Sequence, residues 1–221
     1  MALAFLAQQY FRNYNTQLIA FTVDHNSRPE SAVEAQTVSK NLASIDIRHE
    51  ILKINWPDNK PPRTRFEEVA RDQRQRLLID ACVKHNVPYL ILAHTLDDQL
   101  ETFLMRLTMG SSIYGLGGMR PVSQANYDAA PDMPRPIEFV RPLLRNTKAQ
   151  LKQICLENNI SWVEDPTNQD VTYTIRNSIR QLLSQPENLP QPLRPVNLQN
   201  TIIHLQYTRS DAEKELVVQK E

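Results

Sequence analysis

The sequence predicts an α/β protein with an open parallel sheet and helices on both of its faces. Over residues 1–110, short apolar runs rich in β-branched and aromatic residues alternate with longer amphipathic segments. Consecutive strand–helix units of this kind form parallel sheets with right-handed crossovers. The 221 residues are enough for one such domain and a helical appendage. All four glycines fall in one loop that follows this region, which makes the loop a candidate functional segment.

Composition excludes several classes of protein. The formal net charge is zero, so bulk charge favours neither nucleic acid nor any other partner. No apolar run approaches the ~20 residues of a membrane span, so no membrane partner is expected. The start of the chain resembles neither a signal peptide nor a mitochondrial presequence, and we expect the cytoplasm or the mitochondrial matrix. Cys82 and Cys155 are isolated, which predicts two buried thiols in a reducing compartment.

The first third of the chain reads as helix, strand, helix, strand. Residues 1–12 have a broad apolar face with no capping residue before them, and residues 17–24 form a buried strand. That strand ends in a polar loop containing Asp24, His25 and Arg28, and ligands of parallel sheets bind beyond such strand ends. The plainer alternative is a turn in which Ser31 caps the next helix. That helix covers residues 32–43, and a half-buried strand follows at residues 45–54.

A proline-rich linker then leads into an arginine-rich helix. Between residues 63 and 76 it carries five arginines and no lysine, namely Arg63, Arg65, Arg71, Arg74 and Arg76. Charged helix faces are usually only solvated, whereas guanidinium groups also bind phosphates in bidentate fashion. The sequence leaves a solvated face and a phosphate or RNA contact equally open.

The segment HTLDDQLET follows the next buried strand, residues 87–93. His94 comes directly after the strand, and the spacing of Thr95 and Asp98 predicts a capping box for a helix. Asp97 and Glu101 lie one turn apart, so the carboxylates gather near one face. First-turn acids also complement the helix dipole, which explains the aspartates without a ligand. The functional alternatives are a Mg²⁺ site with Asp97 and Asp98 as ligands, or a site for a cationic amine.

The glycine loop follows that helix. Gly110, Gly115 and Gly118 would allow the backbone to approach a ligand closely. The plainer alternative is that Gly110 ends the helix and the others form turns.

The C-terminal part is less informative. Residues 121–140 are proline-rich and predict an exposed, mobile insertion. Helical order returns at residues 141–159, where Arg145, Lys148 and Lys152 form a basic patch that reads as a solvated face. A proline-rich linker follows Ser184, and residues 196–220 predict one more amphipathic helix.

Four segments together resemble a known family. AHTLDDQLETFLMRLTMGSSIYGLGGM resembles the signature of tRNA(Ile)-lysidine synthetases, members of the PP-loop (N-type) ATP pyrophosphatase superfamily. VDHNSRPES, VRPLLRNTKAQLKQIC and WVEDPTNQDVTYTIRNSIRQLL resemble further motifs of the family, in the same order. The resemblance covers roughly residues 1–183. It implies a Rossmann-like PP-loop ATPase core at 1–183, followed by a linker and helix at 184–221.

The resemblance also implies a reaction. ATP would adenylate the C2 oxygen of the wobble cytidine in an isoleucine tRNA with a CAU anticodon, and the amine of L-lysine would then displace AMP to give lysidine. ATP and Mg²⁺ are the implied cofactors. The implied partners are tRNA(Ile), L-lysine and, as a further option, a second copy of the chain in a homodimer.

Site residues follow by motif position. The catalytic and lysine-handling residues would be His94, Asp97, Asp98 and Glu101. The nucleotide side would be lined by Asp24, His25 and Arg28. Contacts to tRNA or phosphate would come from Arg71, Arg74, Arg141, Arg176 and Arg180. The loop glycines Gly110, Gly115 and Gly118 complete the set.

One family feature is missing from the sequence. The phosphate-binding loop, Ser-Gly-Gly-x-Asp-Ser, would lie directly before a helix like that of residues 1–12. We therefore expect a chain truncated before Met1, which lacks the first strand and the phosphate loop and is inactive as written. Two alternatives stay open. One is a non-catalytic RNA-binding homologue, and the other is a PP-loop tRNA thiolation enzyme, although such enzymes generally carry cysteine pairs that are absent here.

Overall fold

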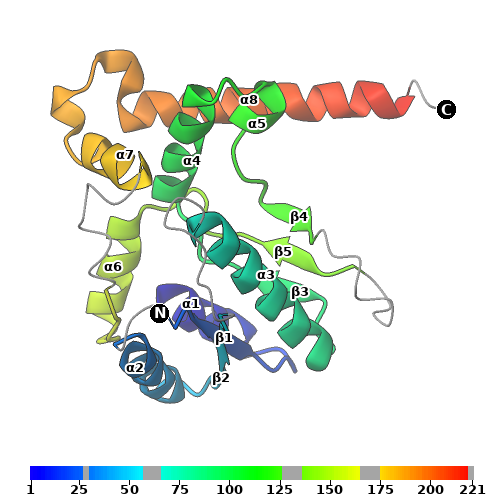
Figure 1. Ribbon diagram of the computed structural model, residues 1–221, viewed down its shortest axis with the longest axis vertical. Helices are drawn as coiled ribbons and strands as arrows, with labels where there is room; N and C mark the ends of the chain where they lie inside the picture. The colour runs from blue at the N-terminus through cyan, green and yellow to red at the C-terminus, as the bar shows by residue number, and fades with distance from the viewer. Residues whose placement is uncertain (27–29, 57–65, 126–135, 165–174, 219–221) are drawn as a thin grey trace. The chain divides into compact units, whose positions relative to one another are not determined.

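The computed structural model describes residues 1–26, 30–56, 66–125, 136–164 and 175–218, and it is an α/β structure (Figure 1). The chain divides into two compact units. Unit 1 comprises Met1–Ala93, Val122–Arg141 and Ala149–Glu164, and unit 2 comprises His94–Pro121, Pro142–Lys148 and Asp165–Glu221. Both β-sheets belong to unit 1, whereas the described part of unit 2 is helical.

Unit 1 begins with the predicted alternation of helix and strand. It contains α1 (Ala2–Phe11), β1 (Ile19–Asp24), α2 (Ser31–Ala43) and β2 (Arg48–Lys53). β1 and β2 pair in parallel, from Ile19 opposite Arg48 to Asp24 opposite Lys53. Because α2 connects two parallel strands and packs against both, these elements form a βαβ unit, as the sequence predicts.

A second sheet lies beside α3 (Phe66–Lys84). Its strands are β3 (Tyr89–Ile91), β4 (Val122–Gln124) and β5 (Glu138–Val140), in the order β3-β5-β4. β3 and β5 are parallel, whereas β4 runs antiparallel to β5. Hydrogen bonds between the described strands thus give two sheets in place of the single parallel sheet expected. One core cluster, with Ile79 and Cys82 of α3 and Phe139 of β5, also takes in Phe21 of β1.

The prediction of an exposed insertion at 121–140 is wrong at its C-terminal end, whereas Val122 and Gln124 at the other end are exposed, as predicted. Ile137 and Phe139 are 4% and 7% exposed, because alternation along β5 turns them into the core beside α3. Six described residues at the two ends form strands, and residues 126–135 lie outside the described residues. Because the middle of this segment is rich in proline, the sequence did not reveal the two strands of three residues each at its ends.

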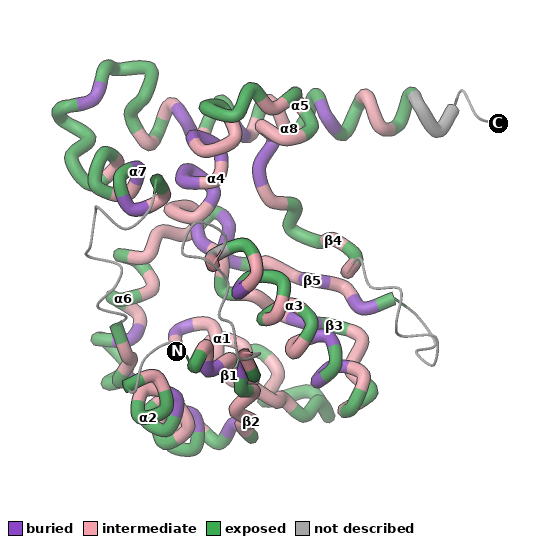
Figure 2. Tube along the Cα trace, in the orientation of Figure 1, coloured by how far each residue is buried: buried purple, intermediate pink, exposed green. Residues whose placement is uncertain are grey.

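Unit 2 is built on α4 (Leu96–Thr108), α5 (Ile113–Leu116), α7 (Ile175–Leu183) and α8 (Pro195–Val218). Leu100, Phe103 and Leu104 of α4 pack against Ile179 of α7 and Ile202 of α8, as the predicted helical spacing implies. Figure 2 shows purple, buried segments on α4, α7 and α8. Leu107 continues the same helical spacing but is 47% exposed, one residue before α4 ends at Thr108.

The helix predicted at 141–159 is shorter than expected, whereas the last helix lies where it was predicted. α6 (Lys148–Glu157) begins seven residues after Arg141, and the intervening turn buries Leu143 and Leu144. Residues 184–194 contain two short 3-10 turns, and Leu189 is buried among them. A domain boundary at 183/184 stays a prediction. Within the described ranges, no helix has both the length and the apolar character to cross a membrane.

Candidate active site

The start of α4 is fixed by the predicted capping box. Thr95 is the N-cap residue, and its hydroxyl accepts a hydrogen bond from the Asp98 N–H at 3.4 Å. Asp98 Oδ2 accepts hydrogen bonds from the Thr95 N–H and hydroxyl, both at 2.8 Å. This reciprocal arrangement satisfies backbone donors that a helix start leaves open. It also fixes the positions of the acids that follow.

Asp97 binds the start of a different helix. Its Oδ2 accepts a hydrogen bond from the backbone N–H of Lys148, the first residue of α6, at 2.7 Å. The neighbouring Leu96 N–H donates to the Asn146 carbonyl at 2.8 Å. A carboxylate at a helix N-terminus is stabilising, so Asp97 attaches the turn before α6 to α4.

Asp98 has a cationic partner as well as its capping role. Lys148 Nζ lies 3.1 Å from Asp98 Oδ1 and 3.7 Å from Glu101 Oε1. Burial by itself would raise the pKa of Asp98, but the Lys148 ammonium and the hydrogen bonds from Thr95 outweigh it and hold that pKa below its ordinary value. Asp98 is therefore an ionised carboxylate at neutral pH.

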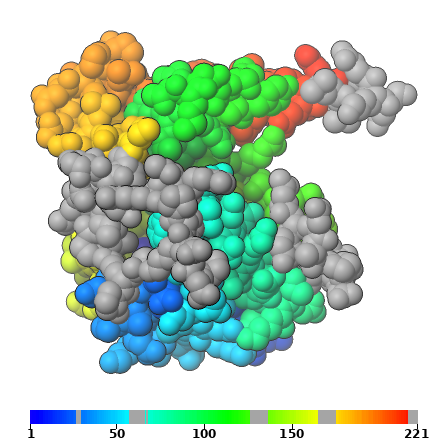
Figure 3. Space-filling view, viewed as in Figure 1, coloured from blue at the N-terminus to red at the C-terminus, as the bar shows by residue number. Residues whose placement is uncertain are grey.

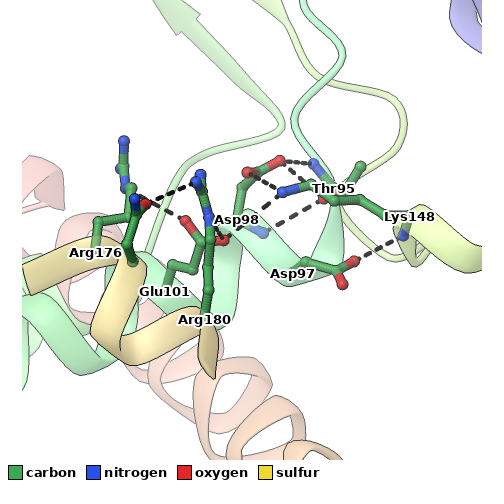
Figure 4. A network of polar contacts seen from close by, with 8 residues as sticks. Thr95, Asp97, Asp98, Glu101, Lys148, Arg176 and Arg180 are labelled. Carbon is green, nitrogen blue, oxygen red and sulfur yellow. Dashed lines mark hydrogen bonds and ion pairs between the residues drawn. The ribbon is translucent and has the colours of Figure 1, made fainter. Parts of the chain in front are cut away.

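Glu101 is the most deeply buried acid of the site, with 2% of its side chain exposed. Arg180 Nε donates to Glu101 Oε1 at 2.7 Å, and Arg176 Nε lies 3.3 Å from Oε2 (Figure 4). The two arginines are four residues apart on α7, so they lie on the same face of that helix. Burying a carboxylate is costly unless cations accompany it, and α7 provides them.

The acids do not fit a Mg²⁺ site in this arrangement. Both oxygens of Asp98 are engaged by donors of the chain, and Glu101 is engaged by guanidinium groups. Mg²⁺ requires oxygen ligands in near-octahedral geometry with their lone pairs available. Across the part of the chain that the structure describes, no group of three or more His, Cys, Asp or Glu side chains could hold a metal.

The glycine loop is held by side chains of unit 2. Arg106 Nη1 donates to the carbonyls of Gly115 at 2.6 Å and Gly118 at 3.3 Å. Arg209 of α8, only 7% exposed, donates to the carbonyls of Tyr114 and Gly118, each at 3.4 Å. In the space-filling view the green residues of this loop lie against the red residues of α8 (Figure 3).

The close approaches that the glycines permit are to the protein itself. Gly118 has a φ of +70°, and a Cβ there would lie 2.5 Å from Gln99 Oε1. A Cβ at Gly117 would lie 3.1 Å from a nitrogen of Arg209, and one at Gly115 would lie 2.9 Å from the Ser111 Cβ. Gly110, at φ +64°, follows the C-cap of α4 with open space around it. Helix termination and tight packing therefore account for these glycines.

Asp24 and His25 lie in unit 1 at the end of β1. Asp24 is buried and accepts hydrogen bonds from the Ser31 hydroxyl at 2.6 Å and the Asn26 N–H at 2.8 Å. Burial would raise the pKa of Asp24, but these hydrogen bonds, together with the charges of Lys53 and His25, outweigh it and lower that pKa. The predicted capping by Ser31 is wrong: Glu30 is the N-cap of α2, and Ser31, inside the helix, turns its hydroxyl to Asp24. Arg28 lies outside the described residues.

The remaining arginines of unit 1 lie on α3 and after β5. Arg71 and Arg74 are exposed, three residues apart on α3. Arg141 Nη1 donates to the Ser123 hydroxyl at 2.9 Å, and its guanidinium lies 5.7 Å from the Phe139 ring centre. Burial, together with the positive charge of Arg71, lowers the pKa of Arg141. Arg63 and Arg65 lie outside the described residues.

The predicted site residues thus fall into two sets. Unit 2 contains His94, the three acids, Arg176, Arg180 and the glycines, whereas the nucleotide-side residues and the other arginines belong to unit 1. Sequence reasoning missed Lys148, which it assigned to a solvated patch. The available signal was the charge balance, since three buried or half-buried acids required nearby cations. It also missed Gln99 and Arg209, whose buried polar side chains fix the glycine loop.

Comparison with known proteins gives consistent results. A family model described as the PP-loop domain matches residues 1–187. The chain is 39% identical over 184 residues to a Schizosaccharomyces pombe protein named "Probable tRNA(Ile)-lysidine synthase", covering 80% of this chain and 40% of that protein. It is 40% identical over 162 residues to the tRNA(Ile)-lysidine synthase of Methylobacterium nodulans, covering 73% and 44% respectively. The chain spans less than half the length of these relatives.

Among solved structures, the U34-tRNA thiolase NcsA from Methanococcus maripaludis, with its [4Fe-4S] cluster, aligns with a TM-score of 0.70 at 13% identity. The alignment covers 93% of this chain and 68% of that one, and it shows a shared fold. The family match over residues 1–187 carries the assignment. The chain therefore belongs to the PP-loop domain family, among relatives that are named tRNA(Ile)-lysidine synthases.

Proposed function

We propose that the chain is the acid-bearing part of a tRNA(Ile)-lysidine synthase. The reaction is the ATP-dependent ligation of L-lysine to the wobble cytidine of a CAU-anticodon tRNA(Ile), through an adenylated cytidine. The observation that carries this proposal is the arrangement of Asp97, Asp98 and Glu101 at the start of α4 with cations around them. It lies within a sequence that is 38–40% identical to proteins named for that activity.

The acids suit the handling of an amine substrate. Carboxylates at Asp98 and Glu101 already accept the ammonium of Lys148, so they have the charge and the oxygen atoms that a lysine ammonium requires. A carboxylate or His94 could accept the proton that the amine loses as it attacks the cytidine carbon. The adenylated oxygen leaves with AMP, which balances the new carbon–nitrogen bond.

The arginines suit the phosphate groups of the substrates. Arg176 and Arg180 neutralise Glu101 and remain 42% and 27% exposed, so they could also contact tRNA or the adenylate. Arg71, Arg74 and Arg141 are the corresponding candidates of unit 1, and Asp24, His25 and Arg28 those for the nucleotide side. ATP is the nucleotide that the family implies. L-lysine, tRNA(Ile), a homodimer, and a cytoplasmic or mitochondrial matrix location are parts of the same proposal.

A tRNA thiolation enzyme is the second candidate, because the solved thiolase shares the fold. Enzymes of that superfamily that thiolate tRNA generally carry cysteine pairs. Cys82 and Cys155 are both buried, and burial raises the pKa of the Cys82 thiol to about 11, so it is not a thiolate at neutral pH. The cysteines therefore favour ligation over thiolation, and a non-catalytic RNA-binding homologue is the remaining alternative.

The test adds the family's phosphate loop to the chain. The sequence lacks Ser-Gly-Gly-x-Asp-Ser, and we expect the chain as written to release no pyrophosphate from ATP. A variant extended at Met1 by a strand and a Ser-Gly-Gly-x-Asp-Ser loop of the family pattern should release pyrophosphate only when both tRNA(Ile) and L-lysine are present. Release with sulfide in place of lysine would favour thiolation. No release under any condition, from a folded extended protein, would favour the non-catalytic homologue.

A further inference from the structure

The ammonium of Lys148 lies between two acids of the proposed site. It is 3.1 Å from Asp98 Oδ1 and 3.7 Å from Glu101 Oε1. The Lys148 backbone is fixed beside the same acids, because its N–H donates to Asp97 Oδ2 at 2.7 Å. Yet 44% of the side chain is exposed, so the ammonium has a direct route to solvent.

We propose that Lys148 is an internal occupant of the ammonium site of Asp98 and Glu101, and that an amine substrate must displace its side chain in order to bind. The inference rests on the proposed function, in which the substrate amine belongs to L-lysine. Both side chains end in the same group, a primary ammonium with three N–H donors and one positive charge. Carboxylate oxygens that accept one such group therefore suit the other.

The charge count supports competition over joint occupancy. Asp97, Asp98 and Glu101 carry three negative charges, and Lys148, Arg176 and Arg180 carry three positive ones. A second ammonium would give the cluster a net positive charge while Lys148 stays in place. Once Lys148 swings into water, the incoming ammonium restores the balance.

Displacement should require little energy. Ion pairs of partly exposed lysines are weak, and the Lys148 side chain regains its freedom in solvent. The two arginines differ, because their Nε atoms contact Glu101, which is only 2% exposed. They keep Glu101 neutralised when Lys148 leaves, so the site remains formed while its ammonium position is vacant.

Calorimetric titration of L-lysine into the purified chain and its variants tests the inference. Lys148→Gln and Lys148→Met should bind lysine about fivefold more tightly than the unmodified chain, because no internal ammonium then competes with lysine for the site. Lys148→Arg retains an internal cation and should bind as the unmodified chain does. Lys152→Gln is the matched control, because it removes the same charge from the same helix at a surface pair with Glu164.

Several results would overturn the inference. One is unchanged or weaker lysine affinity in both neutral variants, with circular dichroism and thermal unfolding like those of the unmodified chain. Another is equal tightening in Lys152→Gln, which would indicate bulk charge. An equal gain in affinity for norleucine, which lacks the side-chain amine, would also overturn the inference. So would the absence of lysine binding in every variant. Lysine-dependent pyrophosphate release by the extended chain judges the proposed function separately.

Discussion

At the scale of single residues, the buried carboxylate of Glu101 is the central feature of the site. The sequence placed it with the catalytic acids, and its partners were not predictable because Arg176 and Arg180 are more than seventy positions away. A carboxylate that is 2% exposed is stable only with compensating cations. Glu101 therefore holds α4 and α7 together, whatever it does for a substrate.

Removing this charge should destabilise unit 2. Glu101→Gln leaves Arg176 and Arg180 without their carboxylate, and we expect a loss of about 3–5 kcal/mol in the free energy of unfolding, measured by urea denaturation. Glu215→Gln, at an exposed position of α8, is the matched control and should change stability by less than about 0.5 kcal/mol. Equal effects of the two substitutions would show that the Glu101 cluster contributes nothing special.

Asp98 should make stability depend on pH in the acid range. Its pKa in the folded chain is lowered, so the folded state binds fewer protons than the unfolded state there. The stabilisation is fully present above the unfolded pKa of about 4 and is lost as the pH falls through the lower folded value. Asp98→Asn should flatten this part of the stability curve, as thermal unfolding between pH 6 and 3 would reveal. An unchanged slope contradicts the assignment.

At the scale of elements, the strength of local signals explains what could be predicted. α4 was predictable from its capping box and from the spacing of Leu100, Phe103 and Leu104, all of which are local. β5 was not, because three residues after a proline-rich segment have no detectable periodicity and the strand exists through pairing with β3. The glycine loop was located correctly, but its long-range partner Arg209 gave no signal in the sequence.

The glycine loop offers a test at this scale. Gly118→Ala places a Cβ at φ +70° and within 2.5 Å of Gln99 Oε1, which also holds Met119. We expect a loss of about 2–3 kcal/mol in thermal or chemical unfolding, from backbone strain plus the displaced Gln99.

Gly110→Ala is the natural control, because φ is +64° there too and the added Cβ would have no neighbour within 4 Å. It should cost only the backbone strain, about 1 kcal/mol. Equal losses in the free energy of unfolding for Gly110→Ala and Gly118→Ala would show that packing of Gly118 against Gln99 does not stabilise the loop.

At the scale of the whole molecule, a net charge of zero conceals local concentrations of charge. The cations of unit 2 near α4 are paired with acids, whereas Arg71 and Arg74 are exposed on α3 of unit 1. Bulk composition therefore said nothing about RNA, and only the placement of individual arginines makes a prediction. Residues in separate units were assigned to one site by motif alone, and that grouping stays a prediction.

Binding of tRNA should respond to these exposed arginines. Arg71→Ala should weaken tRNA(Ile) binding and lower the slope of log affinity against log salt by about 1, because one phosphate contact is lost. Arg76→Ala, which removes another exposed arginine of α3, is the variant with which Arg71→Ala is compared. Filter binding at several salt concentrations provides both slopes, and an identical slope for Arg71→Ala and the unmodified chain would remove Arg71 from the interface.

Incorporation of labelled lysine into tRNA provides the sharpest test of the proposed function. The chain extended at Met1 by the family's phosphate loop, incubated with ATP and radiolabelled L-lysine, should transfer label to a tRNA(Ile) transcript with the CAU anticodon and not to one in which the wobble cytidine is replaced by uridine. Asp98→Asn should lose that transfer while still binding tRNA. Pyrophosphate release without label on the tRNA, or equal labelling of both transcripts, would contradict a lysine ligase that acts on the wobble cytidine.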